Sequence, residues 1–347
     1  MTHTTLPSDT PRTMRVSVLV EPGVIEIRER PVPTPAPGDV LIRVASVGVC
    51  GSDAHYYREG RIGEFVVDQP IVLGHEASGT VVGVGAGVDA DRIGQRVSIE
   101  PQRPDPDTEE SRRGLYNLCP HMQFYATPPI DGALAEYVTI GAAFAHPIPD
   151  GMSEDAAALC EPLSVAIATT RKAGVTAGSR VLIAGAGPIG IATVQTALAF
   201  GATEVFVSDL DPQRRDVATK FGATAVLDPR EQDVAGLHVD AFVDASGAPA
   251  AVLAGIQAVR PAGSVVLVGM GAPEMTLPVQ TIQNRELVLT GVFRYANTWP
   301  TAIALARSGR VDLDSMVTGR FPLAEAEHAL NADRTPGSLK AVVRVQE

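Results

Sequence analysis

Residues 181–200, VLIAGAGPIGIATVQTALAF, decide the fold of this chain. Apolar residues typical of a buried strand lead into a glycine-rich turn and then into a helical pattern. Gly185 permits the tight turn, Gly187 lets the backbone approach a pyrophosphate, and Gly190 allows the helix to pack closely on the strand. The G-x-G-x-x-G order in this context predicts a dinucleotide-binding unit of the Rossmann type. A glycine turn that binds nothing is the alternative.

Strand and helix patterns alternate around this unit, from residue 178 to about residue 293. The strand segments, among them EVFVS, DAFVD and SVVLVGM, are almost continuously apolar. Strands have this composition when helices cover both faces of a parallel sheet. The fold class predicted for residues 164–296 is therefore α/β, with a doubly wound parallel sheet.

Asp209 ends the next predicted strand, at the usual offset of about 20 residues for a carboxylate that binds the ribose hydroxyl groups. Its charge would repel the 2′-phosphate of NADP, so the predicted cofactor is NAD. Arg214 and Arg215 follow closely and could neutralise a phosphate, which keeps NADP as an alternative.

Residues 14–163 have the composition of a β-rich domain, with runs such as RVSVLV and DVLIRVASV between proline and glycine turns. A helical period begins after Ser153, a suitable N-cap, and is expected to bridge the two domains. Residues 297–347 are too few to fold alone and are expected to return to the first domain. Residues 1–13 are expected to form a solvated tail.

Composition limits the possible partners. A chain of 347 residues suits two domains, and its formal net charge of −12 disfavours nucleic acid, which binds basic faces. Three widely spaced cysteines do not suit a disulfide framework and favour a reducing compartment. The sequence shows neither an export signal nor a membrane span, so we expect a cytoplasmic protein without nucleic-acid or membrane partners.

Three patches of the β-rich half carry ligand types that a catalytic zinc ion accepts: Cys50 in VCGSDAHYY, His75 with Glu76 in LGHEASG, and Glu161 in LCEPLSV. Each alone has an ordinary explanation, as a core cysteine, a hydrogen-bonded histidine or an acid at a helix end. Their occurrence together in a chain with a predicted NAD site indicates a catalytic metal site.

The segment GHEASGTVVGVGAGV resembles the signature of the zinc-containing medium-chain dehydrogenases. The segments CGSDAHYYREGRIGEF, ATPPIDGALAEYV, CEPLSVA and GVFRYANTW resemble the sorbitol and xylitol dehydrogenase branch of that family. The resemblance covers nearly everything after the N-terminal tail. It implies a GroES-like catalytic domain beside the Rossmann domain, a homotetramer, and oxidation of a secondary hydroxyl group of a polyol to the ketose by NAD at a zinc ion.

The resemblance also implies roles for single residues. Cys50, His75 and Glu76 match the zinc ligands, and Glu161 matches a residue that binds the metal directly or through water. Asp53 would fix the tautomer of His75, its alternative being an Asx turn after Ser52. Ser52 and His55 match a hydroxyl and imidazole relay, although His55 could instead be a surface residue.

The remaining implied site residues fall into two sets. Substrate contacts are expected from Tyr56, Phe124, Thr127, Glu161, Arg294 and Tyr295, with packing at a subunit interface as the alternative for Arg294 and Tyr295. Cofactor contacts are expected from Gly185, Gly187, Pro188, Ile189, Gly190, Asp209, Arg214, Val268, Gly269, Met270, Val292, Phe293 and Arg294.

A second zinc site of many relatives is expected to be absent. Asp105, Thr108 and Ser111 stand where three of its four cysteines belong, which leaves only Cys119. Three oxygen side chains and one thiol make a poor tetrahedral zinc site, so we predict one zinc ion per chain.

Two other functions remain open. The chain could be a zinc dehydrogenase of the same architecture that acts on threonine, butanediol or a simple alcohol. It could also be a catalytically silent NAD-binding protein, although a complete set of metal ligands argues against that function.

Overall fold

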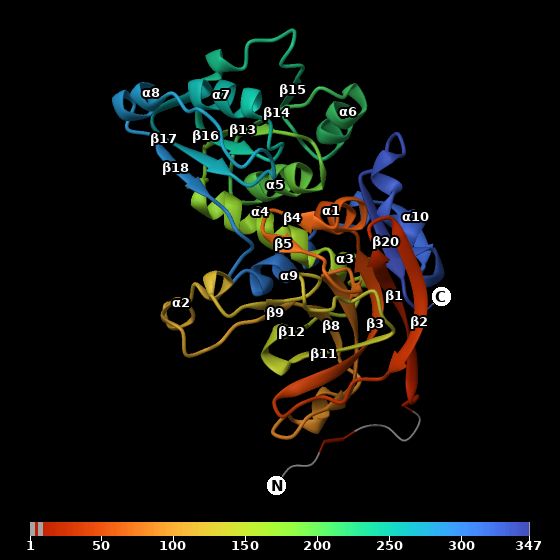
Figure 1. The fold of residues 1–347 in the computed structure, drawn as a ribbon. Helices are drawn as coiled ribbons and strands as arrows, with labels where there is room; N and C mark the ends of the chain where they lie inside the picture. The colour runs from red at the N-terminus through yellow and green to blue at the C-terminus, as the bar shows by residue number, and fades with distance from the viewer. Residues whose placement is uncertain (1–3, 6–9, 347) are drawn as a thin grey trace. The chain divides into compact units, whose positions relative to one another are not determined.

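The computed structural model describes residues 4–5 and 10–346, and the chain divides into two compact units. Unit 1 consists of Met1–Glu161 and Leu313–Glu347, and unit 2 of Pro162–Asp312; each has a sheet of its own (Figure 1). Of the predicted tail, residues 1–3 and 6–9 lie outside the described residues. Thr5, however, exchanges two backbone hydrogen bonds with Val84.

Unit 2 is built on six parallel strands in the order β15-β14-β13-β16-β17-β18. The strands are β13 (Arg180–Ala184), β14 (Glu204–Ser208), β15 (Ala225–Leu227), β16 (Val239–Asp244), β17 (Val259–Leu267) and β18 (Val288–Gly291). The helices are α5 (Pro188–Ala199), α6 (Pro212–Lys220), α7 (Pro249–Ala258), α8 (Val279–Asn284) and α9 (Trp299–Arg307). Helix α4 (Cys160–Lys172) precedes them, and unit 2 begins within it, at Pro162. The order reverses at β13, as in a doubly wound sheet, and the predicted fold class is confirmed.

The boundary at the end of unit 2 differs from the predicted one. Residues 297–312 were expected to belong with the C-terminal segment, but α9 remains part of unit 2. Trp299 is fully buried and its ring packs on that of Tyr295, 5.2 Å away. Arg171 of α4 donates a hydrogen bond to Thr301, and Gln195 of α5 accepts one from the backbone of Asp312. These contacts join residues that are far apart in the sequence, so the local sequence pattern around residue 296 could not predict them.

Unit 1 is β-rich, as predicted. Its main sheet has the order β12-β8-β7-β3-β20-β19, with β11 also paired to β3, and a smaller sheet has the order β2-β1-β6. The strands are β1 (Thr13–Glu21), β2 (Val24–Pro31), β3 (Asp39–Gly48), β4 (Arg61–Ile62), β5 (Phe65–Val66), β6 (Ile71–Val72), β7 (Glu76–Val84), β8 (Arg96–Ile99), β9 (Gln102–Arg103), β10 (Gln123–Phe124), β11 (Tyr137–Gly141), β12 (Ala145–Pro147), β19 (Val317–Pro322) and β20 (Lys340–Arg344). The helices are α1 (Gly51–Glu59), α2 (Glu109–Arg112), α3 (Glu154–Ala158) and α10 (Ala326–Leu330).

The C-terminal strands join the sheet of the N-terminal half through β20, which pairs antiparallel with β3. Asp155 of α3 connects the C-terminal strands β19 and β20 to β3 through hydrogen bonds. Its buried carboxylate accepts hydrogen bonds from Ser46 of β3, Arg320 of β19 and Arg344 of β20, each at 2.8 Å. Burial raises the pKa of Asp155, but Arg344, Ser46 and Arg320 lower it by more, so the carboxylate stays charged.

The predicted helix after Ser153 forms as two helices. The Ser153 hydroxyl accepts a hydrogen bond from the backbone N–H of Ala156 at 2.9 Å, as an N-cap does. The chain leaves helical geometry at Leu159, between α3 and α4, and Glu161 follows at the start of α4. Among the described helices, none is both long and apolar enough to span a bilayer.

Candidate metal and cofactor sites

Three neighbouring strands of unit 1 converge on one buried corner. Strand β3 ends at Gly48, two residues before Cys50, and Cys50 is the N-cap of α1. Strand β7 begins with Glu76, which is paired with Gly48. Strand β20 approaches β3 from the opposite side and begins with Lys340. Residues far apart in the sequence therefore meet because three strand ends coincide.

One ligand atom each of Cys50, His75 and Glu76 lies within 4.8 Å of the other two, and within the described part of the chain no other acidic, histidine and cysteine group of this size is as compact. Ligand atoms at about 2.0–2.3 Å from one tetrahedral zinc ion are about 3.3–3.8 Å apart. The three side chains are therefore close enough to share one ion after a local adjustment. His75 and Glu76 are buried, and Cys50 is half-buried.

The carboxylate of Glu76 is only partly satisfied. Its Oε1 accepts a hydrogen bond from Lys340 Nζ at 2.5 Å, whereas its buried Oε2 has no hydrogen-bond partner among the residues that the structure describes. Leaving such an oxygen unpaired costs about 1–3 kcal/mol or more for a charged group. Oε2 lies directly over Gly48, where a Cβ atom would approach it to 2.1 Å. The glycine makes room for an oxygen that suits a cation.

Asp53 holds this corner together from α1. Its carboxylate accepts hydrogen bonds from the backbone N–H groups of Cys50 at 3.0 Å and Gly74 at 2.9 Å, and its Oδ1 lies 3.6 Å from His75 Nδ1. Burial raises the pKa of Asp53, but His75 and these N–H groups lower it below its usual value. Asp53 therefore lies on the Nδ1 side of the His75 ring, and a metal ion would bind Nε2.

The protonation of His75 responds to the same neighbours. Burial lowers the pKa of His75, but Asp53 and Cys50 raise it by more, to well above its usual value. The same acidic neighbours would attract a metal ion, which binds only the neutral ring.

The other predicted residues of unit 1 lie in different surroundings. Glu161 is buried and outside the group of three, but its charge acts on Lys340. Ser52 is half-buried, and His55 is exposed with its Nδ1 3.2 Å from Glu59. Tyr56 is buried in the hydrophobic core of the unit. Core packing alone would explain this position, without a contact to a substrate.

Phe124 and Thr127 frame a bend beside the metal ligands. The Phe124 ring is buried and packs on the His75 ring, 5.5 Å between centroids. Ala126, between Phe124 and Thr127, has a φ of 55°, a conformation that costs a residue with a side chain about 1 kcal/mol or more. Strained backbone of this kind often occurs at ligand-binding loops.

Unit 2 has a cavity of about 640 Å³ at the carboxyl ends of its strands. Its lining residues include four that are expected to contact a dinucleotide: Gly185, Gly187, Asp209 and Arg214. A Cβ atom on Gly190 would lie 1.9 Å from the carbonyl oxygen of Gly185, whereas one on Gly187 would meet nothing within 4 Å. The third glycine thus allows close packing, and the second leaves backbone open to a ligand.

The Asp209 carboxylate is fixed by the backbone around the glycine turn. Oδ2 accepts a hydrogen bond from the N–H of Ala186 at 2.8 Å, and Oδ1 accepts one from the N–H of Asp211 at 2.9 Å. Each oxygen keeps a further lone pair for a ribose hydroxyl group. Pro188 and Ile189 form the first turn of α5, whose N-cap is Gly187.

The segments after β17 and β18 contain the remaining predicted residues. Val268, Gly269 and Met270 follow β17, and Met270 is 54% exposed. After β18, Val292 leads to Phe293, which is 50% exposed and lies under the Arg294 guanidinium, 4.7 Å away. Arg294 has a φ of 56°, another strained position, and Tyr295 is buried on Trp299. The ring of Tyr295 therefore packs within unit 2.

The lobe expected to lack a second zinc site is closed by hydrogen bonds. The Cys119 thiol accepts one from the N–H of Asp105 at 3.3 Å, and the Thr108 hydroxyl donates one to Ser111 at 3.0 Å. His121 lies 3.1 Å from Asp105. These contacts connect the two ends of the lobe without requiring an ion.

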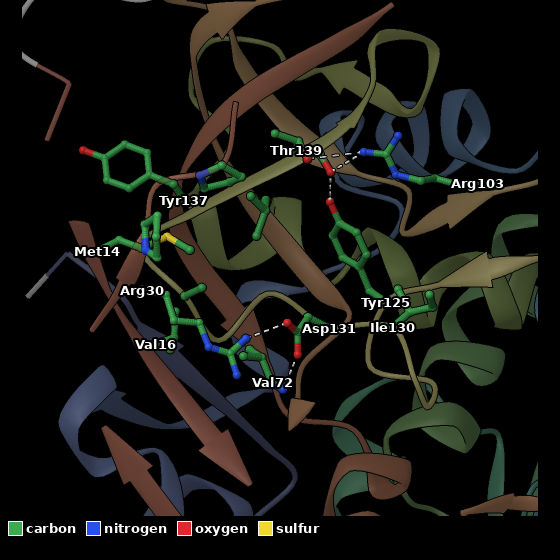
Figure 2. Close-up of a pocket in the computed structure, with 15 residues that line it drawn as sticks. Met14, Val16, Arg30, Val72, Arg103, Tyr125, Ile130, Asp131, Tyr137 and Thr139 are labelled. Carbon is green, nitrogen blue, oxygen red and sulfur yellow. Dashed lines mark hydrogen bonds and ion pairs between the residues drawn. The ribbon is translucent and has the colours of Figure 1, made fainter. Parts of the chain in front are cut away.

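A smaller cavity of about 380 Å³ lies in unit 1, and Cys50, His75 and Glu76 are not among its lining residues (Figure 2). Its charged lining groups are paired, Arg30 with Asp131 at 2.6 Å and Arg103 with Asp39 at 2.9 Å. Tyr125 donates a hydrogen bond to the carbonyl oxygen of Thr139 at 2.6 Å. The cavity brings together no cluster of metal ligands or nucleophiles.

Sequence reasoning missed two residues of the metal corner, Gly48 and Lys340. Gly48 lies in a strand, where glycine is unfavourable unless a neighbour approaches closely. Lys340 directly precedes the apolar residues AVV of the final strand. A lysine in a strand that is expected to be buried indicates a paired charge, and this could have drawn attention to Lys340.

Comparison with known proteins agrees with this arrangement. Residues 36–150 match the alcohol dehydrogenase GroES-like domain, and residues 188–308 match the zinc-binding dehydrogenase family. Sorbitol dehydrogenase of Macaca fascicularis is 44% identical over 333 residues, 93% of each chain. An alcohol dehydrogenase of E. coli CFT073 complexed with NADH has a TM-score of 0.91 at 26% identity, over 96% of this chain and 100% of that chain. A zinc-binding dehydrogenase of Sinorhizobium meliloti 1021 bound to NADP has a TM-score of 0.89 at 30% identity, over 96% and 99%.

Gly48→Ala is expected to weaken zinc binding by about tenfold or more, because the new methyl group would displace the carboxylate of Glu76. Competition with a chromophoric chelator measures the affinity. Gly51→Ala is the matched control, since a Cβ atom there meets nothing within 4 Å. Equal affinities of Gly48→Ala and the unaltered chain would contradict the role given to this glycine.

Proposed function

Because this chain belongs to the zinc-containing medium-chain dehydrogenases, we propose that it oxidises a secondary hydroxyl group of a sugar alcohol to a ketone, with NAD as the hydride acceptor. The observation that carries the proposal is the buried corner where Cys50, His75 and the unpaired Oε2 of Glu76 meet. The family itself establishes an NAD(P)-dependent zinc oxidoreductase. The polyol and the choice of NAD are the finer steps.

We propose Cys50, His75 and Glu76 as the zinc ligands, with Glu161 beside them. When bound, zinc supplies a Lewis acid that lowers the pKa of the substrate hydroxyl group, and NAD supplies the acceptor for its hydride. Asp53 keeps His75 in the tautomer that a metal needs. The tilted Phe124 ring packs against the imidazole and places apolar surface beside it.

The substrate proton needs a route to solvent. We propose that Ser52 receives it from the hydroxyl group and that His55 passes it on. The exposure of His55 and its contact with Glu59 suit the solvent end of such a relay.

A polyol is favoured over a simple alcohol for two reasons. The sorbitol dehydrogenases resemble this chain over nearly its whole length. Moreover, we propose substrate contacts from Tyr56, Phe124, Thr127, Arg294 and Tyr295, a set with several hydrogen-bonding groups, which polyol recognition requires. The strained backbone of Arg294 supports a functional position for that residue.

The first prediction concerns substrate choice. The zinc-loaded protein is expected to reduce NAD with sorbitol or xylitol at a kcat/KM well above those for ethanol, butanediol and threonine. Spectrophotometric assay of NADH formation measures the ratio. A preference for threonine or butanediol would identify the alternative zinc dehydrogenases, and no turnover with any substrate would favour a silent NAD-binding protein.

In the same preparation, metal analysis is expected to give one zinc ion per chain; two would contradict the proposed absence of a second site.

Cys50→Ser is expected to lower kcat by at least about 100-fold, because a hydroxyl is a poorer zinc ligand than a thiolate. NAD binding, followed by fluorescence titration, should stay unchanged.

The preference for NAD is proposed to come from Asp209. Asp209→Ser is expected to improve kcat/KM for NADP by about tenfold or more relative to NAD, since the repulsion of a 2′-phosphate disappears and Arg214 remains in the cavity. Asp233→Ser, a change at another acid lining the same cavity, is the control. An unaltered NAD to NADP ratio in Asp209→Ser would exclude Asp209 as the discriminator.

We propose a cytoplasmic homotetramer that uses β18 for assembly. This strand is at one edge of the sheet of unit 2, and Val288 on it is 56% exposed. Val279 and Phe293 nearby are 60% and 50% exposed. An exposed apolar sheet edge is a template for pairing with a second copy. The three cysteines are all free thiols, which suits the reducing cytoplasm.

Val288→Lys is therefore expected to lower the molar mass measured by light scattering, because like charges would face each other across the paired edge. Val66→Lys, at an apolar position of unit 1 that is 46% exposed, serves as the control. If Val288→Lys leaves the mass unchanged, β18 is not an assembly edge.

A further inference from the structure

Lys340 is a lysine in an unusual place, because this residue type is almost never fully buried unless it is paired. It is 3% exposed at the start of β20, in the metal corner of unit 1. Its Nζ donates hydrogen bonds to Glu76 Oε1 at 2.5 Å and to the carbonyl oxygen of Val49 at 2.8 Å. Both contacts fix the ammonium group beside Cys50.

Stability alone does not account for this pair. Replacing a buried ion pair by apolar side chains of similar size is often neutral or stabilising, because the desolvation of two charges is costly. Methionine would fill the space of Lys340 without that cost. The pair is useful only if the Glu76 carboxylate has to remain charged in this corner and has to be held in one orientation.

We infer, on the basis of the proposed metal centre, that Lys340 is a positioning residue that restricts Glu76 to one metal-binding oxygen. Lys340 occupies Oε1, and the oxygen left without a partner is Oε2, over Gly48. A carboxylate can bind a cation through one oxygen or through both. With Oε1 held, Glu76 fills one coordination position, and the position that a catalytic zinc ion keeps for its substrate remains open.

The charges of the corner support this role. A thiolate at Cys50 and carboxylates at Glu76 and Glu161 would place three negative charges around a doubly charged ion. The ammonium group of Lys340, held by Glu76 and by the carbonyl oxygen of Val49, is a positive charge beside these anions. Its positive charge balances the third anion and also weakens Glu76 as a donor, which keeps the metal ion a strong Lewis acid.

Cobalt substitution tests the inference, because four-coordinate Co²⁺ absorbs visible light more strongly than five- or six-coordinate Co²⁺. The holoprotein with cobalt in place of zinc is expected to have the strong four-coordinate spectrum. In Lys340→Met the freed Oε1 also binds, so the absorption weakens, and kcat of the zinc form falls by about 10- to 100-fold. Lys340→Arg keeps a charged donor and is expected to retain the strong spectrum.

Two further variants show whether the effect passes through Glu76. Adding Glu76→Gln to Lys340→Met removes the second carboxylate oxygen, so the strong spectrum should return. Arg344→Met, on the same strand, breaks the pair with Asp155 instead; it should lower the unfolding temperature and leave the cobalt spectrum unchanged.

The outcomes separate this inference from the proposed function. If the unaltered chain takes up no cobalt, or if Cys50→Ser leaves the thiolate-to-cobalt charge-transfer band in place, the metal centre itself is wrong. If those results are as expected but Lys340→Met has the four-coordinate spectrum, only the role of Lys340 fails. Lys340→Gln is the second neutral variant, and failure of both to fold would make Lys340 a structural residue and overturn the inference.

Discussion

The register of two strand pairings sets the distance between Glu76 and Lys340, and with it the geometry of the metal corner. Glu76 is paired with Gly48 across β7 and β3, and Val342 is paired with the same glycine across β20 and β3. A slip of one residue in either pairing would turn the side chain to the other face of the sheet. The irregularities of β3 between Leu41 and Ile42 and between Val44 and Ser46 lie within this pairing, so they help to determine which residue faces the site.

Buried carboxylates elsewhere in the chain show what is particular about this corner. Asp155 accepts hydrogen bonds from three side chains, and Asp53 accepts two from backbone N–H groups and faces His75. Asp244, at the end of β16, accepts three from Ser246 and Gly247. In these cases the fold supplies the donors, and the acid stabilises local structure. Glu76 is equally buried, but its Oε2 has no hydrogen-bond partner among the described residues and lies in a group with Cys50 and His75, which is why we propose a functional role for it.

How much was predictable depended on how far apart the interacting residues lie. The glycine turn, Asp209 and the Ser153 cap are local patterns, and the structure has each where the sequence indicated it. Lys340 and Glu76 are separated by 264 positions, so no local pattern could pair them. The assignment of α9 to unit 2 and the break at Leu159 likewise depend on tertiary packing. The proposed metal ligands could be singled out without contacts because their residue types suit zinc and because the segments around them resemble a known family.

The acids of the cofactor cavity and of the metal corner differ in how far the chain itself satisfies their hydrogen-bonding capacity. Both oxygens of Asp209 accept backbone hydrogen bonds, and a ribose would only add donors to an acid that is already satisfied. A dinucleotide can therefore leave without exposing an unpaired buried group. The Oε2 of Glu76 has no hydrogen-bond partner among the described residues. Removing the ion from this corner restores an unsatisfied buried oxygen, which costs free energy. The arrangement of donors thus favours a cofactor that exchanges in every turnover and a metal ion that stays.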